Sequence, residues 1–431
     1  MTDQERIEIQ KLIQQEVVPA TGCTEPGAVA LCVAKTCETL GCEPEKITLR
    51  LSKNVFKNAM GVGIPGTGMI GLPIAVAMAV TAGRSERSLE ILTISPEEVI
   101  AAKQWLANHS SCICIGVEEN CDKLYIECCC EAAGKKAKAV IAKRHTNFIY
   151  ISKDDSVILD QKTGVDIEAD TNAACDTPKL SVARIYEYAT TAPISELQFI
   201  NDTVVLNRAA ADEGVKGMGL HTGQILMGHA NGDIVHQVVA RTVAASDARM
   251  EGCTKPIYSN SGSGNQGICC TLPIYEFGKR NGNSDEEITR ALILSHLMSI
   301  YIKRGIGRLS ALCGLVNASM GVSAGLVFLQ GGNIEQIGYA LKNMINTLAG
   351  MVCDGAKPSC ALKMATGVYS AFVSSRLALE DRVVDETDGL SEKDVDRSVS
   401  NLGRLGHDGM DQTDNMILDI MTHKECTCRN D

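Results

Sequence analysis

The stretch that decides the fold class is residues 121–160, CDKLYIECCCEAAGKKAKAVIAKRHTNFIYISKDDSVILD. Its β-branched, aromatic and other apolar residues fall into four short runs, and turn residues divide them at Ala133-Gly134-Lys135 and at Lys153-Asp154-Asp155. This pattern predicts a β-meander, with strands over Leu124–Cys130, Ala137–Ala142, Phe148–Ser152 and Val157–Leu159.

The regions on either side of the meander follow other patterns. Residues 1–110 mix helices with one strand, because Lys46–Leu51 (KITLRL) alternates apolar and polar side chains as a half-buried strand does. From about Pro193 onward, apolar residues recur every three or four positions, which is typical of helices. Helices are predicted over Ile194–Arg208, Asp285–Arg304, Ser310–Leu329, Ile334–Val352 and Ala361–Leu379.

Together these patterns predict an α+β fold of two domains. The first, residues 1–192, is a mixed α/β part with a short β-meander. The second, residues 193–431, is predominantly helical and carries the candidate cluster site described below. The polar segments 167–180 and 380–392 are predicted to be surface connections.

Composition excludes several classes of function. The chain has 431 residues, of which 45% are hydrophobic and 22% charged, so wholesale disorder is excluded. The formal net charge of −11 argues against a nucleic-acid partner, since binding phosphates requires clustered Lys and Arg. Aromatic residues make up 4% of the chain, which also disfavours stacking platforms for bases.

The 19 cysteines indicate a reducing compartment. Their number is odd, and Cys128, Cys129 and Cys130 are consecutive, which suits a regular disulfide framework poorly. The N-terminal MTDQERIEIQKLIQQEVV is a polar amphipathic helix without the apolar stretch of a secretory signal. We therefore expect a cytoplasmic protein whose thiols are mostly small buried hydrophobic groups.

Two long uncharged stretches, Ile64–Gly83 and Leu309–Gly332, exceed the roughly 18 apolar residues that suggest a membrane span. The first contains two prolines and several glycines, and the second contains Ser, Asn and Gln. Neither has an aromatic belt. We expect buried, tightly packed helices and no membrane partner.

The first candidate site is Thr21-Gly22-Cys23-Thr24-Glu25-Pro26-Gly27. Pro26 fits the first turn of a helix, and Thr24 is a plausible cap, so Cys23 lies just before a helix N-terminus. Unpaired backbone N–H groups and the helix dipole favour a thiolate there. The alternative is an ordinary capped turn with an incidental cysteine.

A glycine-rich loop follows at residues 58–68. Gly61, Gly63 and Gly66 match the GxGxxG spacing of dinucleotide sites, but several residues separate them from the predicted strand and Pro65 removes an N–H. A loop whose amides at Gly66 and Thr67 approach a carboxylate is more plausible than a nicotinamide cofactor. A structural turn is equally plausible.

A polar cluster lies at residues 246–267. Arg249 offers a guanidinium fork for a carboxylate, and the stretch 259–267 (SNSGSGNQG) is a run of small and amide residues. We favour a loop that binds an amino acid through Ser261, Ser263 and Asn265 over a flexible solvent loop.

Three cysteines form the last candidate site. Cys353 and Cys360 bracket a Gly/Pro turn, and Cys313 comes from a different helix. Three thiolates with an open position suit either an iron–sulfur cluster with one exposed iron or catalytic zinc. The spacing matches no strong CxxC signature, so on spacing alone core cysteines are favoured.

These stretches together resemble the L-cysteine desulfidase family, which is related to the α subunit of iron–sulfur L-serine dehydratases. The resemblance covers nearly the whole chain. It rests on CTEPGAVAL at 23–31, PGTGMIGLPIA at 65–75, HTN at 145–147, GLHTG at 219–223, AASDARM at 244–250, SNSGSGNQG at 259–267, RLSALC at 308–313 and CDGAKPSCALK at 353–363.

The resemblance implies that Cys313, Cys353 and Cys360 hold a [4Fe–4S] cluster with one open iron and that Cys23 accepts a proton. The implied reaction is β-elimination of L-cysteine to sulfide, pyruvate and ammonia without PLP. L-serine dehydration by the same mechanism and a non-catalytic iron–sulfur or redox-sensing protein remain alternatives. The dehydratases carry a second, β-type domain that this sequence lacks, which argues against serine as the main substrate.

Several points stay open at this stage. Lys363 and His145 are either secondary participants or, respectively, a surface salt bridge and a loop histidine. Cys426 and Cys428 in the tail either cap the cluster at rest or belong to a disordered end. The sequence does not decide whether the chain forms a homo-oligomer.

Overall fold

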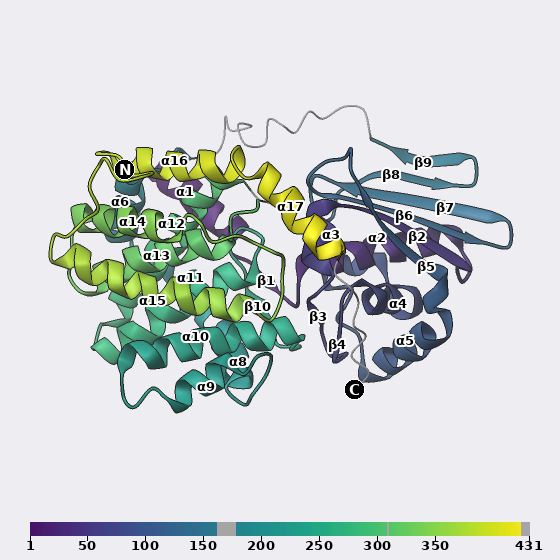
Figure 1. The fold of residues 1–431 in the computed structure, drawn as a ribbon, viewed down its shortest axis with the longest axis horizontal. Coiled ribbons are helices and arrows are strands. Elements are labelled where there is room, and N and C mark those ends of the chain that lie inside the picture. Colours follow the sequence, from purple (N-terminus) through teal and green to yellow (C-terminus); the bar gives the residue numbers. More distant parts are fainter. Residues whose placement is uncertain (162–177, 308–309, 424–431) are drawn as a thin grey trace.

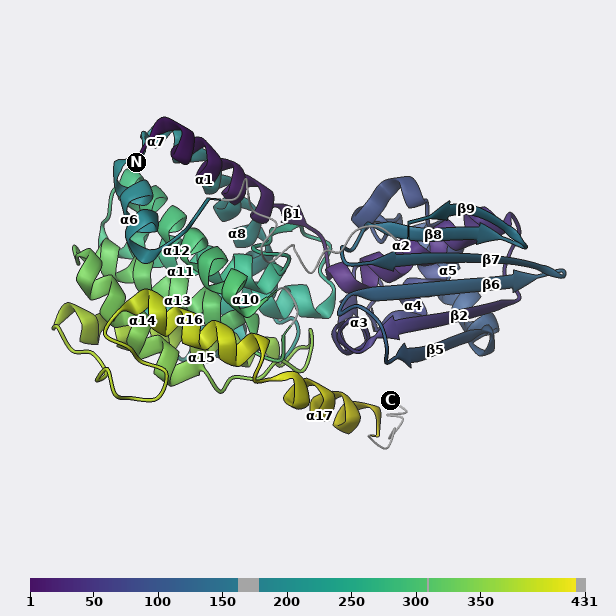
Figure 2. The same ribbon diagram turned by 90° about the horizontal axis from the view of Figure 1, so that it is seen from above.

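The computed structural model describes residues 1–161, 178–307 and 310–423. The chain folds into a helical half and an α/β half that lie side by side, as Figures 1 and 2 show. Buried apolar side chains form one core in each half. The predicted α+β class is confirmed.

The α/β half is built on a six-stranded mixed sheet in the order β5-β2-β6-β7-β8-β9. Strands β2 and β5 are parallel, and the other pairings are antiparallel. The predicted strand at 46–51 and the four-stranded meander are confirmed. The strands are β2 Lys46–Ser52, β5 Ile113–Glu118, β6 Tyr125–Ala132, β7 Lys135–Ala142, β8 Phe148–Lys153 and β9 Ser156–Asp160.

Helices cover one face of this sheet. Helix α2 packs on β6 and β7, and α4 packs on α2. Side chains of β6 alternate, so that Ile126, Cys128 and Cys130 are buried against α2 while their neighbours are half-buried on the other face. These elements are α2 Thr24–Leu40, α3 Lys53–Ala59, α4 Leu72–Ala82, η1 Ser85–Glu90, α5 Pro96–His109 and η2 Ser110–Cys112.

The helical half is a bundle around α12 and α13. Its helices are α1 Asp3–Glu16, α6 Val182–Thr191, α7 Ile194–Leu197, η4 Gln198–Asn201, α8 Asp202–Gly214, α9 Thr222–Gly228, α10 Ile234–Glu251, α11 Gly264–Asn281, α12 Asp285–Ile306, α13 Gly314–Leu329, α14 Ile334–Leu348, α15 Cys360–Leu379 and α16 Val395–His407. The predicted helix over 194–208 is divided between α7, η4 and α8.

The packing groups α1 and α6 with the helical core, although both precede residue 193. The predicted domain boundary after residue 192 stays a prediction. The connection 380–392 links α15 to α16 and is largely exposed, whereas most of the segment 167–180 lies outside the described residues.

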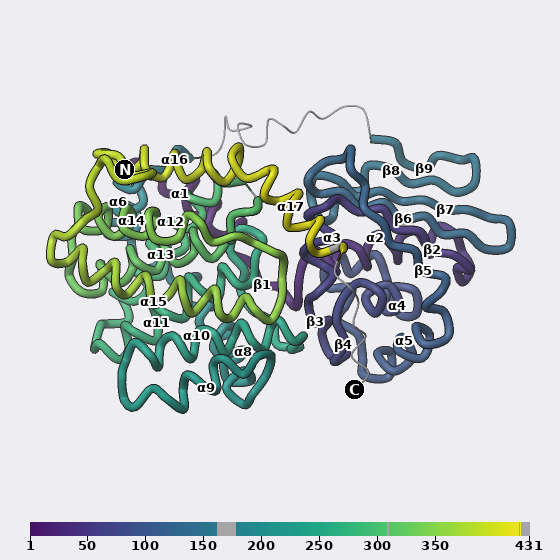
Figure 3. The backbone as a smooth tube through the Cα atoms, in the orientation of Figure 1, coloured from purple at the N-terminus to yellow at the C-terminus, as the bar shows by residue number. Residues whose placement is uncertain are grey.

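Short elements tie the two halves together. Strand β1 (Pro19–Ala20) pairs with β10 (Ile257–Tyr258), and the hairpin β3–β4 (Gly63–Ile64, Met69–Ile70) packs on the end of α10. The tube in Figure 3 shows the last helix, α17 (Asp411–Thr422), leaving the helical half to reach α3. The two uncharged stretches supply buried helices, α4 and α13, as expected, but residues 64–71 of the first stretch belong to the β3–β4 hairpin instead. Among the described residues, every helix is too short or too polar to cross a membrane.

Candidate functional site

Cys23 lies at the N-terminus of α2, in the contact region between the halves. The helix begins at Thr24, and Cys23 with its extended backbone is the cap residue, so the expected cap at Thr24 is wrong by one position. The side chain is 8% exposed and packs into the α/β core with Met250 and Cys360, two residues of the helical half. The turn therefore places a buried thiol at the junction.

The carboxylate of Glu25 holds this thiol. The Cys23 Sγ donates to Glu25 Oε2 over 3.2 Å, and Asn58 Nδ2 of α3 donates to Glu25 Oε1 over 2.9 Å. Burial, followed by the charge of Glu25, raises the pKa of Cys23 to about 12. The expected thiolate is therefore a protonated thiol in this structure, because desolvation outweighs the helix N-terminus and the nearby Arg249 charge.

Cys313 and Cys353 are brought together by a short antiparallel bridge. Leu312 pairs with Val352, the N–H of Cys313 donates to Met351 O over 2.9 Å, and the N–H of Cys353 donates to Ala311 O over 2.6 Å. Hydrogen bonding between the two thiols lowers the pKa of Cys353 to about 6 and raises that of Cys313 well above its usual value. Of the two thiols, Cys353 is therefore the one whose thiolate is favoured.

Cys360 begins α15 on the other side of the turn. Its N–H donates to Lys357 O over 2.9 Å, and its Sγ donates to Gly355 O over 3.7 Å. Burial raises its pKa, and the charge of Cys353 acts in the same direction. The three cysteines predicted as ligands thus lie close enough to influence one another.

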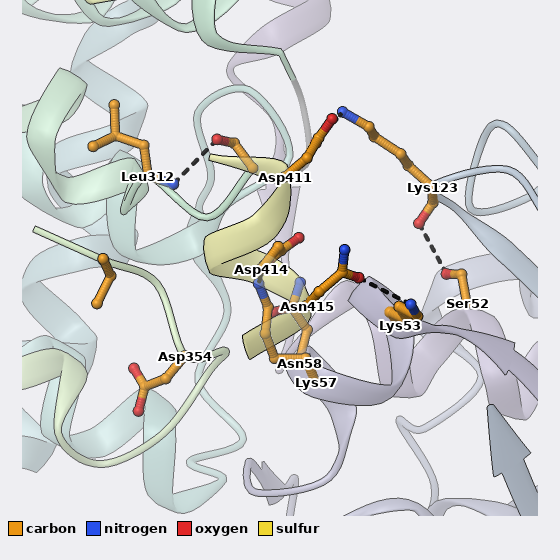
Figure 4. A network of polar contacts seen from close by, with 12 residues as sticks. Ser52, Lys53, Lys57, Asn58, Lys123, Leu312, Asp354, Asp411, Asp414 and Asn415 are labelled. Atoms are coloured by element: carbon orange, nitrogen blue, oxygen red, sulfur yellow. Dashed lines mark hydrogen bonds and ion pairs between the residues drawn. The ribbon is translucent and has the colours of Figure 1, made fainter. Parts of the chain in front are cut away.

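Cations surround these thiols. The charges of Lys57 and Lys363 act on Cys353, and those of Lys363 and Arg249 act on Cys360. Lys57 is almost fully buried and forms an ion pair with Asp414 of α17, which Figure 4 shows beside α3. Lys363 forms an ion pair with Asp354 and donates to Val352 O over 3.0 Å, so its predicted salt bridge is present and lies at the site.

The three cysteines do not suit a zinc ion and a [4Fe–4S] cluster equally well. In the described ranges, no group of three His, Cys, Asp or Glu residues is arranged to hold a single metal ion. A [4Fe–4S] cluster instead binds each cysteine to a different iron, and it carries negative charge that nearby lysines offset. The three thiols and their cationic surroundings fit the donor chemistry of a cluster better than a zinc site.

Arg249, in the last turn of α10, is a buried cation. It is 6% exposed, its Nη2 donates to Gly22 O over 3.1 Å, and its Nε has no partner. A Cβ at Gly264 would lie 2.3 Å from this Nε, so the glycine is required for the guanidinium to fit. The Oδ1 of Asn265 is also buried without a donor. These two groups retain the capacity to bind a polar ligand.

Ser261 and Ser263 occupy a tight turn, and the predicted loop 259–267 ends where α11 begins at Gly264. The Ser261 hydroxyl donates to Asn260 Oδ1 over 2.8 Å, and the Ser263 N–H donates to Asn260 O over 3.0 Å. The loop prediction is thus wrong for Asn265, which is helical because the glycine-containing run supplies the first turn of α11.

Gly66 and Thr67 have a different role from the anion binding expected of them. The Gly66 N–H donates to Gly252 O over 3.1 Å, and the Thr67 N–H and hydroxyl both donate to Ile64 O. Their donors are engaged in closing the β3–β4 turn and docking it on α10, so they are not available to a carboxylate.

Sequence reasoning missed three residues at the junction, namely Glu25, Lys57 and Asn58. Glu25 was visible within the CTEP stretch, but a glutamate in a first helical turn usually serves the helix dipole. Its contact with Asn58 depends on how α3 packs. His145, left open above, lies near enough for its charge to lower the pKa of Glu25, although burial of Glu25 acts in the opposite direction. Cys426 and Cys428 lie outside the described residues.

Comparison with known proteins identifies the family. A family model described as serine dehydratase alpha chain matches residues 86–419. The chain belongs to this family. The family is associated with iron–sulfur serine dehydratases, and membership indicates an enzyme of the lyase type.

Full-length relatives agree with this assignment. The chain is 51% identical to a UPF0597 protein of Bacteroides thetaiotaomicron, over 98% of this chain and 99% of the relative. It is 50% identical to a UPF0597 protein of Bacteroides fragilis, over 99% and 100%. A UPF0597 protein of Porphyromonas gingivalis is 43% identical, over 96% and 98%.

Proposed function

We propose that the protein is a PLP-independent, [4Fe–4S]-dependent lyase that eliminates sulfide from L-cysteine. The observation that carries this proposal is the meeting of Cys313, Cys353 and Cys360 near Arg249, a buried cation that forms no ion pair with any described side chain. A buried charge without a counterion is costly, and a ligand carboxylate removes that cost. Family membership supports the reaction type.

Cys313, Cys353 and Cys360 would hold the cluster. When bound, such a cluster supplies a Lewis-acidic iron with an open position, whose softness suits a thiolate leaving group. Lys57 and Lys363 offset negative charge at this position. Arg249 binds the carboxylate of the amino acid, and Asn265 accepts a hydrogen bond from its ammonium group.

Cys23 takes the proton from Cα. Its thiol must first ionise, and the Arg249 charge is the cationic influence that favours ionisation. Loss of the α-proton and of the leaving group yields 2-aminoacrylate, which water converts to pyruvate and ammonia. A base must lie within hydrogen-bond reach of the proton that it removes, and the junction is where Cys23 meets both halves.

L-Serine is the second candidate substrate, because the family model that matches the chain is that of serine dehydratases. Its hydroxide leaving group needs the same base and the same carboxylate site. A non-catalytic iron–sulfur protein is the remaining alternative, and addition of substrate would leave its spectrum unchanged.

Anaerobic purification tests the proposal. Iron and acid-labile sulfide should each approach four per chain. L-Cysteine should release sulfide and pyruvate, and turnover of L-serine under the same conditions measures the preference between the two. An iron-free protein that remains inert after anaerobic reconstitution would show that the proposal is wrong.

A further inference from the structure

The charges around Cys23 form a pattern that the proposed carboxylate site does not use in full. Glu25 is a carboxylate at 8% exposure, and its donors are the neutral groups of Cys23, Asn58 and Thr24. Among described side chains it forms no ion pair, and neither does Arg249. Each of two buried charges of opposite sign therefore lacks a direct counterion.

Both charges flank the same thiol. Glu25 Oε2 lies 3.2 Å from Cys23 Sγ, and Arg249 Nη2 binds the carbonyl of Gly22, the preceding residue. Both also act electrostatically on Cys23, in opposite directions. Burial raises the pKa of Glu25, and the charge of His145, in the turn between β7 and β8, acts to lower it. A cation and an anion thus both lie close to the proposed base.

We infer that Glu25 binds the α-ammonium group of the substrate, so that Glu25 and Arg249 together recognise a zwitterionic α-amino acid. The inference rests on the proposed function and extends it with a specificity-determining residue. A zwitterion supplies the counterion that each buried charge lacks, at no net charge. Its Cα, which joins the carboxylate and the ammonium, then lies beside Cys23.

The same geometry brings the ammonium group to the proposed base. Glu25 Oε2 accepts the hydrogen bond of the Cys23 thiol over 3.2 Å, so an ammonium group against Glu25 lies next to Cys23. Arg249 keeps its contact with the carbonyl of Gly22 on the preceding residue.

Ligands that lack one charge test the inference. The Cys23→Ala holoenzyme is titrated by calorimetry with L-cysteine, with 3-mercaptopropionate, which lacks the ammonium, and with cysteamine, which lacks the carboxylate. L-Cysteine should bind at least about tenfold more tightly than either analogue, because loss of one partner of a desolvated charge pair is costly.

Two double variants then separate the two charges. Glu25→Gln, added to Cys23→Ala, should make L-cysteine bind no more tightly than 3-mercaptopropionate, and it should leave the affinity for 3-mercaptopropionate unchanged within about threefold. Adding Arg249→Gln instead should weaken 3-mercaptopropionate and spare cysteamine.

Glu43→Gln is the matched control, because Glu43 accepts a hydrogen bond from Trp105 and lies outside the proposed amino-acid site. It should leave all three affinities unchanged. If Glu25→Gln weakens L-cysteine and 3-mercaptopropionate equally, Glu25 is structural and the inference is wrong, while the proposed function stands. If none of the three ligands binds the Cys23→Ala holoenzyme, the proposed amino-acid site itself is wrong.

Discussion

At the scale of single residues, the four candidate cysteines differ in what surrounds the sulfur. Cys23 is buried beside a carboxylate, and burial together with that charge raises the pKa of its thiol. Cys353 faces a thiol donor and lysine charges, which favour its thiolate. A thiolate is the form that binds metal, whereas a neutral thiol that loses its proton on demand suits a base. Cys353 therefore differs from Cys23 in the direction that the proposed roles of ligand and base require, whereas Cys313 and Cys360 share with Cys23 a pKa that is raised.

The first prediction follows from that difference. Cys353→Ser should reduce iron and acid-labile sulfide to near zero, because serine oxygen is a poor ligand for iron in clusters. Cys23→Ala should retain the cluster and lower turnover by about 10²–10⁴-fold, the usual contribution of a general base. Metal analysis and pyruvate release measure the two effects.

Cys112→Ser is the control for this pair, since Cys112 is a half-buried cysteine that follows α5. It should retain both the cluster and turnover. Full turnover in Cys23→Ala would contradict the assignment of the base, and a normal iron content in Cys353→Ser would contradict the assignment of the ligand.

A second prediction concerns Gly264, where side-chain size decides the fit. A Cβ there would lie 2.3 Å from Arg249 Nε and 2.7 Å from Ile257 Cδ1. Gly264→Ala should displace the guanidinium and raise KM for the amino acid, by about tenfold if the carboxylate contact is weakened by 1.4 kcal/mol. Gly228→Ala is the control for the loss of a glycine, since Gly228 ends α9 without a positive φ and no atom lies within 4 Å of its Cβ position. An unchanged KM in Gly264→Ala would argue against a carboxylate site at Arg249.

At the scale of elements, α17 connects the end of the chain to the candidate site. Asp414 pairs with the buried Lys57 of α3, and Asp411 pairs with the exposed Lys123. A hollow of about 300 Å³ lies beside these residues, lined by Lys53 and Asn415 among others. The helix therefore secures the lysine whose charge acts on Cys353.

Two aspartates of α17 give the third prediction. Asp414→Asn leaves a buried ammonium unpaired and should destabilise the fold by about 2–4 kcal/mol, because removing one partner of a buried pair is costly. Asp411→Asn should cost at most about 1 kcal/mol, since its partner is exposed. Urea midpoints measure both. If both variants lowered the free energy of unfolding equally, the burial of Lys57 would not determine how much its ion pair contributes to stability.

The sequence predicts best those elements whose stabilising interactions join residues close together in the chain. The strands of the meander were predictable within a few residues, because alternation is local. Strand β5 was missed because ICIGVE is a half-exposed edge strand containing Gly116, and its partner β2 lies far earlier in the chain.

The same distinction holds at the candidate site. The sequence predicts which cysteines are candidates, but their meeting requires the bridge between Leu312 and Val352. Gly66 and Thr67 were placed in the wrong role because their amides are engaged by Gly252 and Ile64, and only the first of these contacts is distant in sequence. A sequence does not distinguish an anion-binding loop from a closed turn unless the partners of the loop's N–H groups are known.

At the scale of the whole molecule, polar groups buried deep in the helical half link the candidate site to the core. His296 of α12 is fully buried, and its Nδ1 and Nε2 contact Asn260 and Thr271 at 3.0 Å each. Asn260 belongs to the turn that carries Ser261. The network fixes that turn against α11 and α12, so its stability matters for the site.

Burial lowers the pKa of His296 to about 3, which yields the last prediction. The folded protein keeps the imidazole neutral, whereas the unfolded chain binds a proton below its ordinary pKa of about 6.5. The stabilisation is therefore complete above pH 6.5 and is lost as pH falls from there toward 3, by about 1.4 kcal/mol per pH unit. His296→Gln should remove this part of the slope, while the exposed control His229→Gln should keep it. Urea midpoints between pH 7 and 5 measure the slopes. A slope unchanged by His296→Gln would mean that the pKa of this histidine is the same in the folded and the unfolded protein, which would contradict its burial as a neutral imidazole between Asn260 and Thr271.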